Sequence, residues 1–539
     1  MIRNLTQTFT MSNSSNQFTY VDDNQELSIA SIRTGDLEQG IYKHIKHDNK
    51  QDNTGLSSGK KKPYLPKFPD RSTFRVDFDG PKDPCHPYFY PLWRKILCSF
   101  SAALTTFSIT FGSTIFAQGS ENLMEICNVS YTVASLTTSL FVLGFASGPI
   151  IFCPISELFG RKIVLIISCF GYVCFTFAVA SGKDLQTIML CRFFAGFVGG
   201  GPLAVAPGVL TDLFQPKDRP RTITIFPMVF FSGSMLGPVV GGFVTRSKNL
   251  GWRWNSYVSG MIGSLALLCT CFVLKETHHP TLLTKKAQSL RKQTGIWGFY
   301  ATQEDITIDW KAIARENVAK PMIFLITEPI ILLLSIYNAF IYGMVYAFLS
   351  IIQMVFSGIY GWKAGVFQLP YLSMLLGVFV GGAIIVYFEL SYNHKSETTK
   401  GSPIPETKLP PIMIGGSTFV IGIFLFGWTG NYPNKTHWIL PVIGTFFIGN
   451  GIILVYLPSI TYIIACYPSV AASASASNMY LRTTFAASFP LFSRQMFGNL
   501  TIRWASTMLG CVGILLLPVP SLFYKFGARA RGRSKYAKK

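Results

Sequence analysis

The chain has 539 residues, of which 49% are hydrophobic and 14% charged, and its formal net charge is +21. A chain of this composition, with a mean hydropathy of +0.35, is either several soluble domains or one integral membrane bundle, and the distribution of its apolar residues decides between them. Its eleven cysteines lack metal-ligand spacing, which argues against a metal centre or a disulfide framework.

Residues 1–92 are rich in Asn, Gln, Ser, Thr, Asp and Lys and lack the apolar stretch of a signal peptide. A composition this polar does not bury enough apolar surface to fold alone, so the segment is expected to be a disordered cytosolic tail. Trp93, Arg94 and Lys95 then mark the first membrane interface, an aromatic and two cations beside an apolar run.

Twelve mostly apolar segments follow, each long enough to cross a hydrocarbon core about 30 Å thick. Six lie at 96–117, 131–153, 163–182, 187–210, 222–244 and 255–274, and six at 327–350, 364–387, 411–430, 437–460, 471–494 and 503–525. The expected fold is an all-α integral membrane protein with two six-helix bundles, 93–274 and 327–525. A cytosolic linker at 275–326 joins the bundles, and a basic cytosolic tail at 526–539 follows the second.

Two similar halves around a central linker are typical of carriers that open alternately to either side of the membrane. The alternative on this layout alone is an unrelated twelve-span channel or membrane enzyme.

The distribution of Lys and Arg predicts the orientation in the membrane. With both termini in the cytosol, sixteen basic residues fall in cytosolic loops and seven in outer loops. The basic residues are therefore distributed as expected for the two sides of a membrane, and no nucleic-acid partner is expected. Asn-x-Ser/Thr sequences at Asn128, Asn434 and Asn499 all fall in outer loops and are glycosylation candidates. The plasma membrane is the preferred location, with the vacuolar membrane as the alternative.

Opposite charges flank two turns on the cytosolic side. Glu157, Gly160 and Arg161 lie between the second and third spans, and Asp212 and Arg219 lie between the fourth and fifth. Ion pairs worth ~0–1 kcal/mol when hydrated still bias two conformations of similar free energy, so these residues are candidates for a cytosolic gate. Solvated loop charges are the alternative.

The fifth span contains GSMLGPVVGGF at 233–243. Gly233, Gly237 and Gly241 are four residues apart and share one helix face, which allows a second helix to approach closely. Pro238 interrupts the helical hydrogen bonding next to Gly242, which lipid tolerates only where neighbours or a cavity compensate. We expect a bent, glycine-faced helix about which two bundles rock; a plain packing seam is the alternative.

Ionisable side chains within the spans are few, and each is a functional candidate because burial costs ~2.5–3.5 kcal/mol. Arg192 lies about two turns into the fourth span, and the polar first span offers it hydrogen-bond acceptors. Arg192 is either a gate for proton coupling or a helix-packing arginine. Arg482, in the eleventh span, is expected to be structural.

No Asp or Glu occurs from 407 to 539, which leaves Glu328 as the carboxylate of the second half expected to reach a membrane cavity. A helix continued from Glu328 places Ser335, Tyr342 and Tyr346 on nearly the same face. A carboxylate, a hydroxyl and two phenols suit a cationic or aromatic ligand. A hydrated position of Glu328 near the cytosolic interface is the alternative.

The sequence also indicates which source of energy would drive transport. The chain has no GxxxxGK[ST] loop for a nucleotide, so uphill transport depends on a gradient. A membrane potential is worth ~2.3 kcal/mol per charge per 100 mV, and proton import is the natural counterflow. No cofactor and no metal are expected.

Three of these motifs resemble signatures of the major facilitator superfamily. GPIIFCPISELFGRK at 148–162 resembles its cytosolic loop, CRFFAGFVGGGPLA at 191–204 its fourth-span motif, and 233–242 the fifth-span motif associated with antiporters. Over roughly 80–539 the chain is similar to fungal twelve-span drug:proton antiporters, and among them to the polyamine transporter group. The matching stretches include KETHHPTLLTKKAQSLR after the sixth span, YNAFIYG at 337–343 and AASFPLFSRQMF at 486–497.

The resemblance implies a monomeric carrier, not an enzyme, that uses protons to export drugs or other small amphipathic or cationic compounds. The group's acids after the seventh and tenth spans are replaced here by Ser350 and Ala465, which favours neutral or anionic drugs over polyamines. The alternatives are a nutrient uptake facilitator or symporter, and a non-transporting receptor with a carrier fold.

Overall fold

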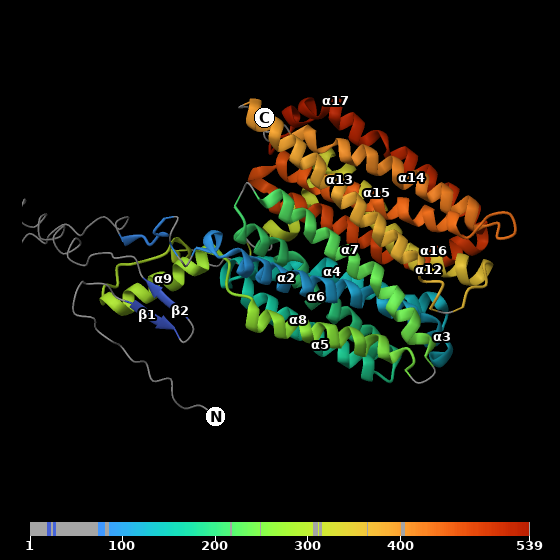
Figure 1. Cartoon of the computed structure of the whole chain (residues 1–539), viewed down its shortest axis with the longest axis horizontal. Coiled ribbons are helices and arrows are strands. Elements are labelled where there is room, and N and C mark those ends of the chain that lie inside the picture. The colour runs from blue at the N-terminus through green and yellow to red at the C-terminus, as the bar shows by residue number, and fades with distance from the viewer. Residues whose placement is uncertain are drawn as a thin grey trace, which may run out of the picture. The chain divides into compact units, whose positions relative to one another are not determined.

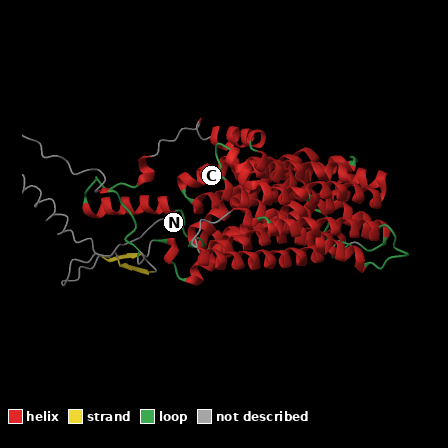
Figure 2. Ribbon diagram, turned by 90° about the horizontal axis from the view of Figure 1, so that it is seen from above, coloured by secondary structure: helices red, strands yellow, loops and turns green. Residues whose placement is uncertain are grey.

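The computed structural model describes residues 19–22, 25–28, 74–80, 83, 86–215, 218–247, 250–305, 311, 315–363, 365–399 and 405–537. Most of these residues are helical (Figure 1 and Figure 2). The chain divides into two compact units. One comprises Met1–Tyr90 and Leu282–Ile306, and the other comprises Pro91–Thr281 and Thr307–Lys539.

The smaller unit combines parts of the predicted tail and linker. Its described elements are β1 (Thr19–Asp22), antiparallel to β2 (Gln25–Ser28), η2 (Pro87–Phe89), most of α9 (His279–Thr294) and η4 (Thr302–Asp305). Val76 and Ala287 pack in a small core with Phe299. Lys286 of α9 lies 2.7 Å from Asp79 and 2.9 Å from Asp83. The rest of the predicted tail lies outside the described residues.

The larger unit begins with a half whose helices match the first six predicted spans. They are α2 (Leu92–Ile115), α4 (Tyr131–Phe159), α5 (Arg161–Ser181), α6 (Leu185–Leu213), α7 (Arg219–Arg246) and α8 (Arg253–Val273). The short η3 (Phe116–Gly119) and α3 (Ser120–Cys127) continue α2. The end of the bundle where α2 begins, expected to face the cytosol, is called the inner end below, and the opposite end the outer end.

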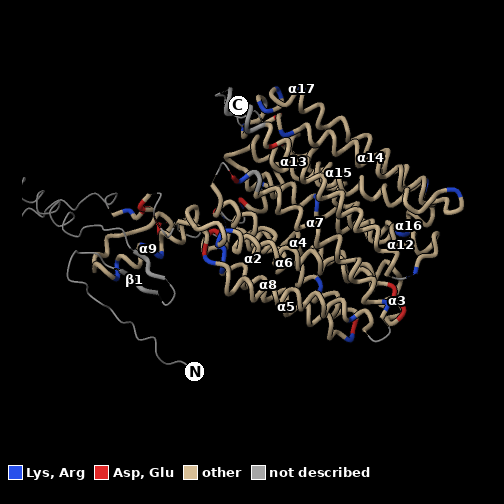
Figure 3. Tube along the Cα trace, viewed as in Figure 1, with Lys and Arg blue, Asp and Glu red and all other residues tan. Residues whose placement is uncertain are grey.

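The second half has η5 (Arg315–Ala319), α11 (Lys320–Thr327), α12 (Pro329–Gln353), η6 (Met354–Ile359), α13 (Pro370–Thr399), η7 (Pro405–Lys408), α14 (Pro410–Gly430), α15 (Ile439–Cys466), η8 (Pro468–Val470), α16 (Ala471–Leu516) and α17 (Pro518–Arg533). α12 is the most enclosed of the spans, with 89% of its most apolar window buried. Acidic and basic residues gather at the ends of the helices and are sparse between them (Figure 3).

Eleven helical stretches of the described chain are long and apolar enough to cross a membrane, and the last of them contains two spans. Thr501 has φ 64° and ψ 157°, which breaks α16 into two helices. The part after the break runs antiparallel to α14, because Arg503 donates to Tyr432 beyond the end of α14 and Arg531 pairs with Glu406 before its start. The predicted number of twelve spans is therefore confirmed.

Candidate substrate and proton-coupling site

The glycines of α7 form a packing seam with α2. A Cβ atom at Gly233 would lie 2.7 Å from the carbonyl oxygen of Phe107, and one at Gly237 would lie 2.8 Å from that of Phe111. Gly241 meets the next turn of α2 in the same way. Both helices belong to the first half, so these glycines let α2 and α7 approach each other within one bundle. α7 is a single helix through Pro238.

Gly242 faces the second half instead. A Cβ atom there would collide with the side chain of Gln368, just before α13. Gln368 donates a hydrogen bond of 3.0 Å to Gln118 of η3, and its own amide oxygen accepts one from the backbone of Gly365. The fourth glycine of the motif therefore leaves room for an amide bridge between the two halves at the outer end.

Arg192 is buried inside the first half, with 4% of its surface exposed. Its three hydrogen bonds all go to backbone carbonyl oxygens of α2 and α4: those of Gly112 (2.9 Å), Ser113 (3.2 Å) and Thr137 (3.3 Å). The rings of Phe116 and Phe141 lie 4.6 and 4.1 Å from its guanidinium carbon. α2 supplies two of the acceptors, as expected from the polar sequence of the first span. Carbonyl oxygens do not take up a proton at physiological pH. They therefore stay available as acceptors, and the protein solvates the positive charge of Arg192 at all physiological pH values.

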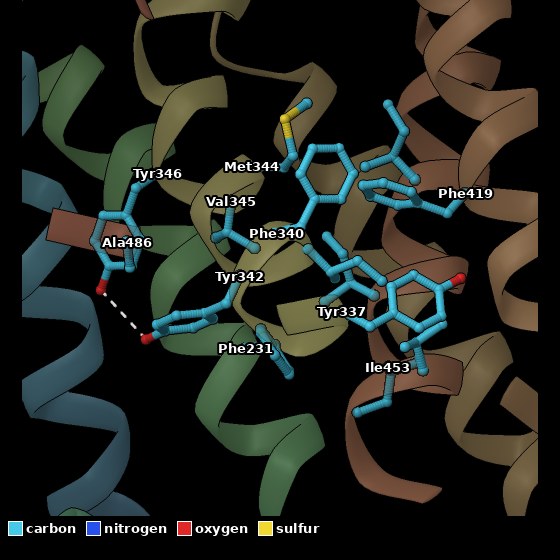
Figure 4. Packing of buried hydrophobic residues seen from close by; sticks show 14 of the residues in the cluster. Phe231, Tyr337, Phe340, Tyr342, Met344, Val345, Tyr346, Phe419, Ile453 and Ala486 are labelled. Atoms are coloured by element: carbon cyan, nitrogen blue, oxygen red, sulfur yellow. Dashed lines mark hydrogen bonds between the residues drawn. The ribbon is translucent and has the colours of Figure 1, made fainter. Parts of the chain in front are cut away.

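A chain of hydroxyl groups runs into the second half from Ser113, whose backbone carbonyl accepts a hydrogen bond from Arg192. The hydroxyl oxygen of Ser113 lies 3.2 Å from that of Tyr346. The hydroxyl oxygen of Tyr346 lies 3.5 Å from that of Tyr342, and Figure 4 shows this second contact. Both phenols are buried, with 0% and 2% exposure. The predicted pair of tyrosines therefore lies where α12 meets α2, at the boundary between the halves.

Arg482 of α16 lies on the other side of these phenols. Its guanidinium carbon is 4.6 Å from the ring centre of Tyr342, 4.7 Å from that of Tyr456 and 5.9 Å from that of Phe230. The three rings come from α12, α15 and α7. Sequence periodicity gave no sign of this aromatic surrounding, because its members lie on three separate helices.

Glu328 does not join this cluster. Its backbone is extended (φ −113°, ψ 102°), and its carbonyl oxygen accepts a hydrogen bond from the backbone of Leu332, so it is the N-cap of α12. The rise of fourteen residue steps from Glu328 to Tyr342 places the carboxylate about 20 Å away along the helix axis. Glu328 accepts hydrogen bonds from Tyr467 (2.8 Å) and Ser534 (2.9 Å) at the inner end. Only 6% of its surface is exposed, so it is not a hydrated interface residue either.

Ser335, one turn and a half into α12, accepts a hydrogen bond of 3.3 Å from Asn478 of α16. This contact ties two helices of the second half together. Of the predicted set, the structure therefore brings Arg192, Tyr342 and Tyr346 into one hydrogen-bonded group and leaves Ser335 and Glu328 in separate contacts.

The predicted gate residues gather at the inner end of the first half. Arg161 pairs with Asp212 at 3.3 Å, so the ion pair links the two predicted turns. Arg161 also donates to Ser156 at 2.8 Å. Glu157 is exposed, and Arg219 donates to the backbone of Phe214 at 3.2 Å. All of these residues lie in the first half.

Glu276 is the centre of this cluster, although no sequence pattern marks it as a candidate. Its carboxylate accepts from the backbone N–H groups of Arg161 (2.8 Å) and Lys162 (3.2 Å), which open α5. A carboxylate at a helix N-terminus is stabilised by the helix dipole and by the free N–H groups. Gly160 has φ +98°, and a Cβ atom there would collide with this carboxylate. The glycine of the loop motif is therefore required by the position of Glu276.

His278 lies two residues after Glu276, and its ring nitrogen lies 2.9 Å from the hydroxyl of Thr281. Burial lowers the pKa of His278 to about 4, and the positive charge of Arg161 acts in the same direction. The imidazole is therefore neutral at pH 7.

At the outer end, polar contacts join the two halves. Tyr131 and Ser350 have hydroxyl oxygens 3.1 Å apart, and Arg494 pairs with Glu121 at 3.4 Å. Ser350, which replaces the acid of the polyamine group, therefore bridges the halves. The three candidate glycosylation residues, Asn128, Asn434 and Asn499, are all exposed.

Comparisons with known proteins agree with this architecture. The profile of the Major Facilitator Superfamily matches residues 100–490. The chain is 51% identical to the Major facilitator superfamily multidrug transporter FLU1 of Candida albicans, over 96% of this chain and 84% of the relative. It is 44% identical to the Multidrug transporter TPO1_2 of Candida glabrata, over 88% and 82%.

Among solved structures, the xylose transporter XylE from E. coli has a TM-score of 0.55 at 15% identity, over 80% of this chain and 99% of that one, which indicates a shared fold. The chain therefore belongs to the major facilitator superfamily and is a multi-pass membrane transporter, not an enzyme.

Proposed function

We propose that this chain is a proton-coupled secondary transporter that exports drugs and other small amphipathic compounds by alternating access. The moving bodies are the bundles 93–274 and 327–525, and the protein works as a monomer. The names of its two relatives, both multidrug transporters, support the substrate class.

The contact between Ser113 and Tyr346 carries the proposal. Ser113 offers its backbone carbonyl to Arg192 and its hydroxyl to Tyr346, so one residue connects a buried charge of the first half to the second half. Arginine is not deprotonated in proteins, so Arg192 does not itself carry the proton. The charge of Arg192 instead shifts the proton affinity of nearby groups. A change in the position of Arg192 is transmitted through Ser113 to the contact between the halves.

Alternating access requires contacts at the outer end that break when the carrier opens outward. The amide bridge from Gln118 to Gln368 and the hydroxyl contact from Tyr131 to Ser350 fit this role. Each is a neutral hydrogen bond with a net worth of ~0.5–1.5 kcal/mol, small enough to break during a transport cycle.

The proposed location is the plasma membrane, where export lowers the cell content of a toxic compound, with the vacuolar membrane as the alternative. Exposed Asn128, Asn434 and Asn499 support glycosylation of the outer loops. A shift in mobility after endoglycosidase treatment, abolished by replacing all three residues with Gln, tests this assignment.

The proposed function is tested by drug accumulation in cells that express or lack the protein, with and without a proton uncoupler. We expect expressing cells to hold several-fold less of a fluorescent drug, and the uncoupler to abolish this difference. Accumulation that rises with expression would instead indicate an uptake carrier. Equal accumulation in all four conditions would indicate a receptor that does not transport.

A further inference from the structure

Arg482 is a buried cation whose hydrogen-bonding capacity is unused. Only 6% of its surface is exposed, yet its Nε and Nη1 atoms have no hydrogen-bond partner among the described residues. The rings of Tyr342 and Tyr456 lie against the guanidinium at 4.6 and 4.7 Å. Aromatic faces attract a cation, but they do not accept the N–H groups at its edge as an oxygen does.

The two buried arginines of the bundle therefore differ in kind. Arg192 has three carbonyl acceptors and is satisfied by the protein. The Nε and Nη1 atoms of Arg482 have none in the described part of the chain, and a buried charge left without acceptors is costly. A structural arginine, as expected from the sequence, would have acquired protein acceptors as Arg192 did.

Asn338 is a second unsatisfied polar group on the same side of α12. Its exposed fraction is 1%, and neither its amide oxygen nor its amide nitrogen has a partner among the described residues. Asn338 follows Ser335 by three residues and precedes Tyr342 by four, so the three share one helix face. Ser335 contacts Asn478 and Tyr342 contacts Arg482, so this face of α12 is the one turned to α16.

The helices whose rings surround Arg482 supply no carboxylate to it. The sequences of α7, α12 and α15, and of α16 itself, contain no Asp or Glu. These helices therefore provide no counter-ion for Arg482, and an anionic ligand would supply one.

We propose that Arg482 and Asn338 form a subsite for the carboxylate of an amphipathic organic acid. The planar guanidinium takes both carboxylate oxygens, as arginine does with such groups, and the Asn338 amide donates a further hydrogen bond. Phe230, Tyr342 and Tyr456 then hold the aromatic or apolar body of the ligand. This inference rests on the proposed function, and it names the kind of drug that the transporter takes: one bearing an anionic group and not a cationic one.

The test uses the full-length protein purified in detergent and three probes of one shape. These are 1-naphthoate, 1-naphthamide and 1-naphthylmethylammonium, which are anionic, neutral and cationic, and their binding is measured by calorimetry. We expect naphthoate to bind at least tenfold more tightly than the amide, and the ammonium compound most weakly. Equal affinity for the acid and the amide, or a preference for the ammonium compound, would overturn the inference.

Two substitutions test whether Arg482 and Asn338 cause the preference for the acid over the amide. Arg482→Gln is expected to abolish the preference for the acid, and Asn338→Ala to reduce it several-fold. The matched control is Arg494→Gln on the same helix, whose partner is Glu121, and it should keep the native preference. A native preference in Arg482→Gln would overturn the assignment.

The thermal unfolding transition, measured without ligand, shows whether each variant is folded. Because Arg482 makes no hydrogen bond in the described chain, the empty Arg482→Gln variant should unfold within a few degrees of the native protein. A large fall would indicate a structural arginine and overturn the inference. If the preference is absent while efflux of a neutral drug remains sensitive to an uncoupler, the subsite fails and the proposed function stands. Absence of any efflux by the native protein would overturn the proposed function itself.

Discussion

The hydroxyl oxygens of Ser113 and Tyr346 lie 3.2 Å apart and join α2 of the first half to α12 of the second. Ser113 also holds Arg192 through its carbonyl oxygen, and Tyr346 continues through Tyr342 to Arg482. The two buried arginines are thereby connected across the boundary that moves in an alternating-access cycle.

Replacing Tyr346 with Phe tests this connection. The change removes the contacts of the Tyr346 hydroxyl with Ser113 and with Tyr342, each worth up to ~0.5–1.5 kcal/mol, and leaves Ser113 without a partner across the boundary. We therefore expect export to fall about 2- to 10-fold at normal expression. The control is Tyr337→Phe on the same helix, whose hydroxyl is buried without a partner in the described chain. Control export should match the native rate, and equal rates in both variants would contradict the role of Tyr346.

Arg192→Lys is expected to uncouple transport. A lysine ammonium is a compact charge that does not span the three carbonyl oxygens held by the guanidinium, and charge-assisted hydrogen bonds are worth ~1.5–3 kcal/mol each. Export driven by a proton gradient should fall at least tenfold. In the same assay Arg291→Lys, at a partly exposed ion pair with Glu304 in the smaller unit, should retain native export. Full coupling in Arg192→Lys would leave Arg192 as a packing residue.

Gly237→Ala tests the seam between α7 and α2. The new Cβ atom would lie 2.8 Å from the carbonyl oxygen of Phe111, and such overpacking costs about 1–3 kcal/mol. We expect a lower thermal transition and reduced export. Gly498→Ala in α16, where no atom lies within 4 Å of the new Cβ, should behave as native. A native transition in Gly237→Ala would mean that the seam is looser than described.

The inner cluster predicts a dependence of stability on pH. The pKa of His278 falls from 6.5 to about 4 in the folded protein. The neutral imidazole therefore contributes stability above pH 6.5, and this contribution is lost as the pH falls from 6.5 toward 4. The thermal transition of the native protein should fall by several degrees more over this range than that of His278→Gln. His437→Gln, at an exposed histidine, should keep the native pH profile.

Much of the fold is predictable because its signals are local. Each span is an uninterrupted apolar run, and glycines four apart, such as Gly233 and Gly237, identify a helix face without any knowledge of the partner. The positive φ of Thr501, which separates the last two spans, left no mark in the sequence, yet the length of the apolar region still required two crossings.

The site is less predictable because its contacts lie far apart in the chain. Helical periodicity places Glu328 on the same face as Tyr342, but Glu328 is the N-cap of α12 and lies about 20 Å from Tyr342 along the helix axis. Glu276 lies 115 residues from Arg161, whose backbone it caps, and no helical period relates them. The surrounding of Arg482 needs rings from three helices. The sequence therefore identified the charged candidates, whereas their partners required the packing of the bundle.

The central claim is that substrate export and proton import are coupled, and the most direct measurement uses purified protein in sealed liposomes. A pH-sensitive dye inside reports proton flux while a fluorescent drug reports transport, under an imposed pH gradient. We predict that drug moves against its gradient only when the pH gradient is present, and that drug added to the side from which it is exported starts proton flux in the opposite direction. Drug movement that is unaffected by the pH gradient, with no drug-dependent proton flux, would contradict the account.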